Sequence, residues 1–211
     1  MSDIDRLVEN LVEEATPVTP VPSPLRLALK WIAGAVAYLA VALLIAGPRP
    51  DLMDQFHQPW FDAELLSLLL IFLSTVFSAA LLAFPDLHQK RRAAYAPAVA
   101  FVLLVAVLFL SWRHHLPPPP LPVHSYQCTL SIALCSVLPA GWLFYLMRGY
   151  ASTHPRLAGV NVLLAAFSVA ALWLRLHEVN DSITHVVIWH YLPMLAVGAL
   201  GIWLGRRVLR W

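Results

Sequence analysis

Long apolar runs alternate with short polar segments along most of this chain. Six of the runs are each about 18 to 20 residues long, the length that an α-helix needs to cross the hydrocarbon core of a bilayer. We therefore predict an all-α, polytopic membrane protein that is embedded in a lipid bilayer by six transmembrane helices. Their expected ranges are about 27–47, 65–84, 94–112, 127–147, 157–176 and 186–205.

Residues 1–15 follow a different pattern, that of a short amphipathic helix. Apolar side chains recur there at i, i+3, i+4, i+7 and i+8, which places them on one helical face. A helix of this length is marginal by itself in water, so its apolar face is expected to need a partner. That face consists of Ile4, Leu7, Val8, Leu11 and Val12, and Asp5, Glu9 and Glu13 are among the acids on the other faces.

Residues 16–26 form a proline-rich connection with Pro17, Pro20, Pro22 and Pro24. Proline at this density favours an extended, semi-rigid spacer of polyproline type. The spacer would hold the first helix away from the membrane. A simple helix break before the first span is compatible with the same residues. We therefore divide the chain into an amphipathic helix (1–15), a spacer (16–26) and a six-helix membrane domain (27–211).

Composition and charge agree with a membrane protein and predict its orientation. Of the 211 residues, 60% are hydrophobic and 12% are charged, whereas soluble domains carry about twice that charged fraction. Cytoplasmic segments of membrane proteins are enriched in Lys and Arg. If both termini are cytoplasmic, 11 of the 14 basic residues lie inside and only Arg49, Arg113 and Arg175 lie outside. We therefore expect both termini in the cytoplasm, and no secretory signal peptide.

Candidate metal ligands gather near the predicted outer ends of the last three spans. Cys128 opens the fourth span, and His177, His185 and His190 lie around the outer ends of the fifth and sixth. Thiolate and imidazole together suit a soft or borderline metal ion. The five-residue spacing of His185 and His190, however, does not place both on one face of an α-helix. A metal or redox sensing site and histidines that merely contact water and lipid headgroups both remain open.

The two cysteines are expected to have different roles. Cys128 and Cys135 are seven residues apart, about 10.5 Å along a helix axis, which is beyond disulfide reach. Cys128 is expected near the outer surface, where its thiol would be exposed to metal or oxidants. Cys135 is expected deeper, as a small packing residue. If sulfur chemistry occurs in this chain, we expect it at Cys128.

Several other functional classes find little support in the sequence. It has no Gly-rich phosphate loop, nucleophile elbow or His-Glu-x-x-His motif, so we predict no enzyme activity and no bound organic cofactor. No predicted span has Asp, Glu, Lys or Arg at its middle, which disfavours an ion-coupled transporter. A small membrane redox or haem protein would need two histidines facing one another in the bundle, and none is predicted at mid-span. That class and a metal-transport component are the alternatives.

Several segments form a further pattern. They are the acidic amphipathic start, PLRLALKW from Pro24, GPRPDL from Gly47, the cysteine that opens span four, HPRLAG from His154, Trp189 in span six and the terminal GRRVLRW. Together they resemble the NrsF family (negative regulator of sigma F) of bacterial inner-membrane anti-sigma factors. The resemblance covers essentially the whole chain, and GPRPDL and GRRVLRW are its most specific parts. It implies a bacterial inner-membrane protein with six spans and cytoplasmic termini.

The resemblance also implies a partner. Family members hold an extracytoplasmic-function sigma factor through the N-terminal cytoplasmic segment, and no direct contact with nucleic acid is expected. Acidic side chains there would complement the basic surfaces of a sigma factor. Carried over to this chain, the sigma-binding residues would be Ile4, Asp5, Leu7, Val8, Glu9, Leu11, Val12 and Glu13.

The resemblance further implies release of the sigma factor on metal or oxidative stress. Cys128 matches the first family cysteine, and His177 stands where many members have a second one. This departure argues against a two-thiol disulfide switch. Cys128 and His177 are the expected signal-sensing residues. A transition-metal ion bound by them remains open as the signal, and so does a sensor that has lost or changed its signal. The oligomeric state does not follow from the sequence.

Overall fold

The structure is a computed structural model that describes residues 3–14, 22–85, 91–114 and 125–209. These residues form α-helices and one π-helical segment, and no strand occurs among them. The six long helical segments confirm the predicted all-α membrane fold. The helices are α1 (Asp3–Glu13), α2 (Pro24–Ala46), α3 (Leu52–Gln55), α4 (Pro59–Leu82), α5 (Arg91–Ala94), α6 (Ala96–His114), α7 (Tyr126–Met147), α8 (Pro155–His177), α9 (Ile183–His185), the π-helix η2 (Val186–Tyr191) and α10 (Pro193–Val208).

Proline sets the starts of three membrane helices. Pro24, Pro59 and Pro155 each occupy the first turn of a helix, where proline's missing N–H has no helical partner to lose. The Ser23 hydroxyl also caps α2 by accepting a hydrogen bond from the Arg26 N–H at 3.4 Å. Because Pro59 starts α4, the second span begins six residues earlier than predicted, at Pro59 instead of residue 65. Residues 16–21 of the predicted spacer (16–26) lie outside the described residues, and its last three residues, 24–26, belong to α2.

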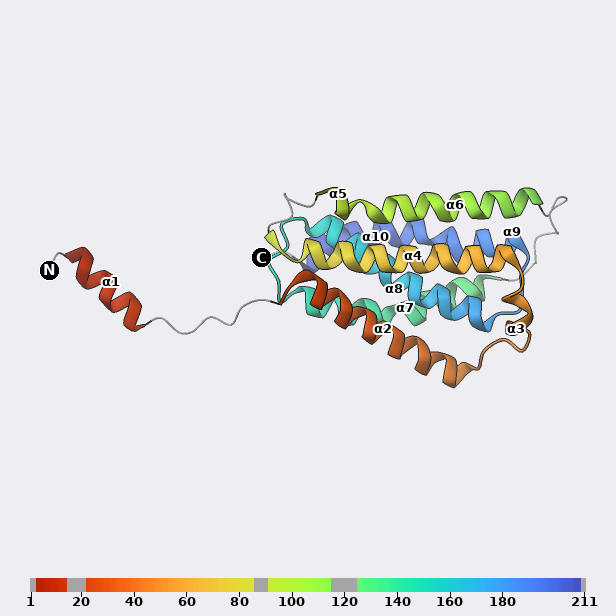
Figure 1. Cartoon of the computed structure of the whole chain (residues 1–211), viewed down its shortest axis with the longest axis horizontal. Coiled ribbons are helices and arrows are strands. Elements are labelled where there is room, and N and C mark those ends of the chain that lie inside the picture. The colour runs from red at the N-terminus through yellow and green to blue at the C-terminus, as the bar shows by residue number, and fades with distance from the viewer. Residues whose placement is uncertain (1–2, 15–21, 86–90, 115–124, 210–211) are drawn as a thin grey trace.

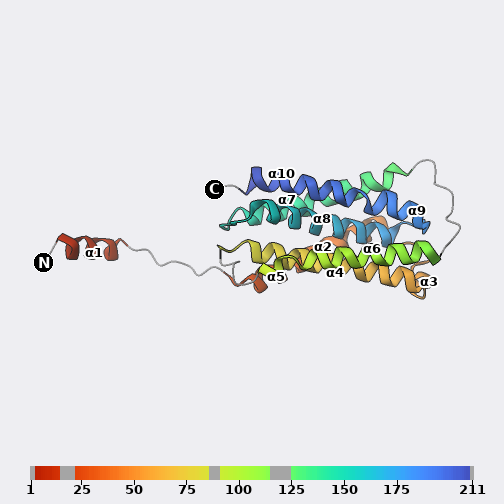
Figure 2. The same ribbon diagram turned by 90° about the horizontal axis from the view of Figure 1, so that it is seen from above.

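The long helices run side by side, with α8 at the centre (Figures 1 and 2). Helix α8 packs against α2, α4, α7 and α10, and most of its residues are buried. Its sequence is rich in alanine, including Ala165, Ala166, Ala170 and Ala171, which lets the neighbouring backbones approach closely in lipid. The beginning of α2 and the end of α10 lie at one end of the bundle, which we call the proximal end. The opposite end, with α3 and α9, is the distal end.

Helices α8 and α10 cross with their backbones in contact. A β-carbon added to Gly201 would lie 2.7 Å from the Val160 Cα atom, and one added to Gly159 or Gly205 would also meet backbone atoms. Only glycine fits at these three positions, because backbone atoms cannot move aside as a flexible side chain does. The crossing fixes the last helix against the centre of the bundle.

Gly201→Ala is expected to destabilise the protein by about 1–3 kcal/mol, because overpacking against backbone forces the two helices apart. Gly198→Ala is the matched control, since a β-carbon at Gly198 meets nothing within 4 Å. Alanine there should leave stability unchanged or raise it through better helix propensity. Thermal unfolding of the purified protein in one detergent would measure both. Equal effects of the two substitutions would contradict the close crossing.

The π-helix η2 follows from Pro193. Proline has no N–H to donate to the carbonyl four residues earlier and its ring clashes with that carbonyl. The Trp189 carbonyl is therefore free of an α-helical partner, and the Thr129 hydroxyl of α7 donates to it at 2.6 Å. The Leu192 N–H instead bonds to the Val187 carbonyl, five residues back, at 2.9 Å. The wider turn brings residues five apart onto one face.

Candidate functional site at the distal end

Two histidines meet inside the bundle at the distal end. His185 and His190 lie at either side of the π-helical turn, and both are buried. Their Nε2 atoms are 3.1 Å apart and their rings meet edge to face. The expectation that five residues separate them onto different faces is therefore wrong, because it assumed α-helical geometry. Pro193 was the sequence signal that could have revealed the π-helical turn.

Cys128 completes a group of three candidate ligands. One ligand atom each from Cys128, His185 and His190 lies within 4.8 Å of the other two. The expectation of an exposed Cys128 is wrong, since the residue is only 9% exposed and belongs to the packed core. It does lie at the distal end, but its side chain points into the bundle. Its Sγ atom is 3.9 Å from the Glu178 Oε2 atom, so a carboxylate stands beside the thiol.

His177 lies apart from this group. Its Nδ1 atom is 2.8 Å from the Gly47 carbonyl oxygen, and its ring stacks on Trp173. The structure thus brings together three of the four sequence-predicted metal ligands. Glu178, the next residue in the chain, is placed beside Cys128 where the sequence had suggested His177. Cys135 lies seven residues further along α7, is half-buried and is not bonded to Cys128.

The three residues fit a borderline metal ion. Zinc binds imidazole nitrogen at 2.0–2.1 Å, which in a tetrahedral site puts two such nitrogens roughly 3.3 Å apart. The observed 3.1 Å between the histidine nitrogens is close to that separation. The sulfur and nitrogen atoms would need to approach by about 1 Å from their outer limit of 4.8 Å. Among the described residues, Glu178 is the nearby carboxylate that could serve as a fourth ligand.

A buried ion pair lies next to the histidines. The Arg175 Nε atom of α8 is 2.7 Å from the Glu64 Oε1 atom of α4, and the Tyr191 hydroxyl donates to the same oxygen at 2.5 Å. The second span was predicted to begin at residue 65, which left Glu64 in the preceding loop, but Glu64 lies inside α4. The earlier start of α4 carries Glu64 into the bundle, where only a partner of opposite charge makes its burial tolerable.

The segment GPRPDL connects α2 to this ion pair. Gly47 has φ of 80°, a left-handed conformation that favours glycine. The Arg49 N–H donates to the Leu176 carbonyl at 2.9 Å, and its guanidinium bonds to both Asp51 and Asp181 at 2.8 Å. This guanidinium lowers the pKa of Asp51 to about 2. The two acids in turn raise the pKa of Arg49.

Asp181 joins the two arginines into one network. Its carboxylate contacts Arg49 and also lies 3.2 Å from the Arg175 Nη1 atom. The Phe61 ring lies beneath both guanidinium groups, at 5.6 and 5.1 Å from its centroid. The network ties α2, α4, α8 and the α8–α9 connection together around Cys128, His185 and His190. It holds the distal end of the bundle in one arrangement.

Arg175→Met is expected to cost about 3–5 kcal/mol of stability, because it leaves the buried Glu64 carboxylate without its cation. The double substitution Glu64→Leu with Arg175→Met should recover most of this loss, since both charges are then removed. Thermal unfolding of the four proteins of this cycle would measure the coupling. If the two single effects simply add in the double variant, the ion pair does not hold the distal end as described.

The six apolar spans and the exposed N-terminal helix define a polytopic helical membrane protein with a separate amphipathic helix ahead of its first span. The model of the NrsF family, described as negative regulator of sigma F, matches residues 11–211. The chain therefore belongs to the NrsF family and is an anti-sigma factor, whose partner is a sigma factor. The family match begins within α1, so residues 1–10 precede it.

Two curated relatives support this assignment. The anti-sigma-F factor NrsF of Caulobacter vibrioides (strain NA1000 / CB15N) is 28% identical over 211 residues, covering 98% of this chain and 99% of the relative. The probable anti-sigma-F factor NrsF of Azospira oryzae (strain ATCC BAA-33 / DSM 13638 / PS) is 38% identical over 85 residues, 40% of each chain. No solved structure matches this chain.

Proposed function

We propose that this anti-sigma factor holds an extracytoplasmic-function sigma factor at the bacterial inner membrane through α1, and releases it when a metal ion binds at the distal end. The observation that carries the proposal is the uncovered apolar face of α1. Ile4, Leu7, Val8, Leu11 and Val12 are 54–73% exposed. Helix α1 lies apart from the bundle in both views (Figures 1 and 2).

The exposed face of α1 suits a protein partner. A short amphipathic helix gains most of its stability by packing its apolar face into a groove of another protein. The acids Asp5, Glu9 and Glu13 lie on the other faces of the helix and would attract a partner with a basic surface. Coupled folding and binding of this kind gives a reversible complex, because part of the interaction energy is spent on ordering the helix.

The distribution of charge supports a cytoplasmic position for α1. The proximal end of the bundle carries Arg26, Lys30, Arg92, Arg148, Arg156, Arg206 and Arg207. Basic residues at the ends of spans favour the cytoplasmic side. Helix α1 precedes α2, which begins at that end. The sigma factor and α1 would then share the cytoplasm, while Cys128, His185 and His190 would face the periplasmic side.

A metal signal is supported by the ligand group at the distal end. Thiolate and two imidazoles are a donor set for soft and borderline ions. The Nε2 atoms of the two buried histidines already lie 3.1 Å apart, close to the separation of two imidazole ligands on one ion. A bound cation would draw Cys128 of α7 toward the π-helical turn. Both α7 and α10 continue from there to the proximal end.

Two alternative signals fit the same residues less well. A disulfide would need a second thiol near Cys128, and the chain's other cysteine is Cys135, seven residues along the same helix. A haem would need its ring between two axial histidines. His185 and His190 do face one another, but 3.1 Å between their nitrogens leaves no space for a porphyrin. A metal ion requires only a small closure of the group.

Co-purification of the full-length chain from its native membranes tests the first half of the proposal. We expect a sigma factor to be retained by the wild-type chain and to be released when the metal is added. Retention of no sigma factor, in cells where the chain represses its target genes, would contradict sequestration through direct binding. Retention that metal does not alter would contradict only the proposed signal.

A further inference from the structure

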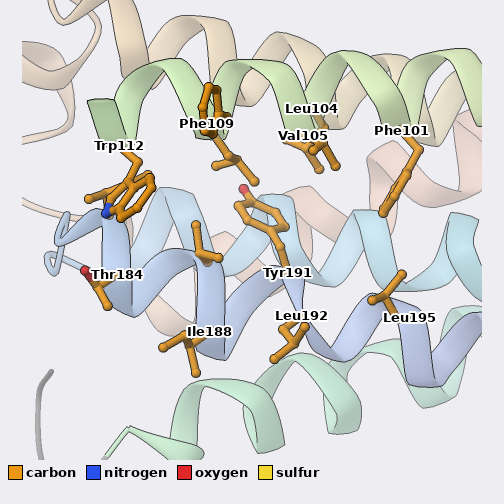
Figure 3. Close-up of a pocket in the computed structure, with 13 residues that line it drawn as sticks. Phe101, Leu104, Val105, Phe109, Trp112, Thr184, Ile188, Tyr191, Leu192 and Leu195 are labelled. Carbon is orange, nitrogen blue, oxygen red and sulfur yellow. The ribbon is translucent and has the colours of Figure 1, made fainter. Parts of the chain in front are cut away.

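A long apolar groove lies between α6 and the segment formed by α9, η2 and α10 (Figure 3). Its volume is about 480 Å³, within the range of pockets that enclose a small organic ligand. Leu104, Leu108, Ile183 and Tyr191 are buried and form its floor, whereas Phe109 and Leu192 are exposed at its sides. The groove shares no lining residue with the group of Cys128, His185 and His190 or with the exposed face of α1.

The groove opens toward the bilayer. Both of its walls are membrane-spanning helices, and the side chains at its edges are among the exposed apolar residues of the protein. In a membrane those side chains meet hydrocarbon instead of water. An occupant must therefore be apolar along most of its length, and a water-soluble ligand or peptide does not fit this description.

The groove has one polar end. Trp112 and Thr184 lie together at the distal end, while Phe101 and Leu195 lie at the other (Figure 3). The Thr184 hydroxyl oxygen is buried and has no hydrogen-bond partner in the described part of the chain. Tryptophan side chains favour the membrane interface, where the indole N–H meets polar groups. The occupant therefore has an apolar length and a hydrogen-bond acceptor at one end.

The length of the groove matches one leaflet. Phe101 and Trp112 are eleven residues apart on α6, which corresponds to roughly 16 Å along the helix. The hydrocarbon core of a bilayer is about 30 Å thick, so the groove spans about half of it. Its polar end stands close to the last residue of α6, His114. This is the depth at which a phospholipid places the ester groups that begin its acyl chains.

We propose that this groove binds one acyl chain of a phospholipid from the distal leaflet, with an ester carbonyl accepting a hydrogen bond from the Thr184 hydroxyl once that side chain turns toward the groove. The acyl chain would lie over Tyr191, whose hydroxyl bonds to Glu64 and whose ring lines the groove. A lipid in this position fills the space between α6 and η2. It would also lie against the helical turn that carries His185 and His190.

Native mass spectrometry of the full-length protein, purified in a mild detergent, tests this site. The wild-type chain should carry one phospholipid, identified after extraction. Val105→Trp should lose it, because Val105 lines the groove and the larger side chain fills it. Leu192→Trp fills the groove from the opposite wall and should have the same effect. Thr184→Val, which removes only the hydroxyl, should weaken retention without altering the shape of the groove.

Val137→Trp is the matched control. Val137 is exposed to a similar degree as Val105 and Leu192 but lies on α7, outside the groove, so this variant should retain the lipid. Unfolding temperatures near the wild-type value would show that each variant is folded. Equal retention by Val105→Trp, Leu192→Trp and Val137→Trp would overturn the proposal. Recovery of an isoprenoid quinone or only detergent from the wild-type protein would overturn the assignment to phospholipid.

Discussion

Replacement of Leu7 by aspartate is expected to release the sigma factor and to switch on its target genes without any signal. Leu7 is 59% exposed at the centre of the apolar face of α1. Burial of a leucine side chain contributes about 1.5–3 kcal/mol, and the new carboxylate would also have to be desolvated. The affinity for the sigma factor should therefore fall about a hundredfold or more. Binding of purified sigma factor to the full-length chain in lipid nanodiscs would measure it.

Asn10→Asp is the matched control for this substitution. It adds the same charge to the same helix, but Asn10 lies outside the apolar face. We expect it to retain affinity within a few-fold of the wild-type value. Leu11→Asp should reproduce the effect of Leu7→Asp. If both leucine variants still bind and repress fully, the apolar face of α1 is not the docking surface.

Replacement of His190 by glutamine is expected to abolish metal binding at the distal end. The change removes one of the three clustered ligands while it keeps a polar side chain of similar size. Loss even of a residue that only orients a ligand costs about 10–100-fold in metal affinity, so loss of the ligand itself should exceed that. Titration calorimetry with Zn²⁺ on the full-length protein would measure the affinity. Binding should also release a proton as the Cys128 thiol becomes a thiolate.

His177→Gln tests whether His177, which the sequence suggested as a ligand, takes part in metal binding. Because His177 contacts the Gly47 carbonyl and stacks on Trp173, we expect its replacement to leave Zn²⁺ affinity nearly unchanged. Tight binding by His190→Gln together with loss in His177→Gln would contradict the proposed ligand group. Because coupling between two binding sites is reciprocal, bound sigma factor should weaken metal binding by the same factor that metal weakens sigma binding. A chain that binds metal without this coupling would have a metal site that is not the signal.

The architecture was accessible from the sequence because lipid imposes a strong rule. Backbone groups in a membrane must bond internally, so six long apolar runs could form little other than six helices. The ends of those runs were less predictable. Glu64 follows Pro59 within a polar stretch, and periodicity alone could not show that Arg175 of another helix compensates its charge. Pairs that are distant in sequence, such as Glu64 with Arg175, require tertiary structure.

The candidate site was predicted only in part. The residue types at Cys128, His185 and His190 indicated a metal site, but their spacing argued against it under α-helical geometry. Pro193 changes that geometry by excluding one helical hydrogen bond, and Thr129 accommodates the freed carbonyl. Glu178, and not His177, lies beside the Cys128 thiol because α8 ends at His177. A pattern of hydrophobic residues does not specify the end of a helix to one position.

Site-specific photo-crosslinking in native membranes tests the central claim most directly. A photoreactive amino acid at Leu11 of the full-length chain would report what covers the apolar face of α1 in the cell. The account predicts a crosslink to a sigma factor, identified by mass, that disappears on addition of the metal and is absent when the probe replaces Asn10. Crosslinks from Leu11 only to lipid, or to a protein other than a sigma factor, would contradict it.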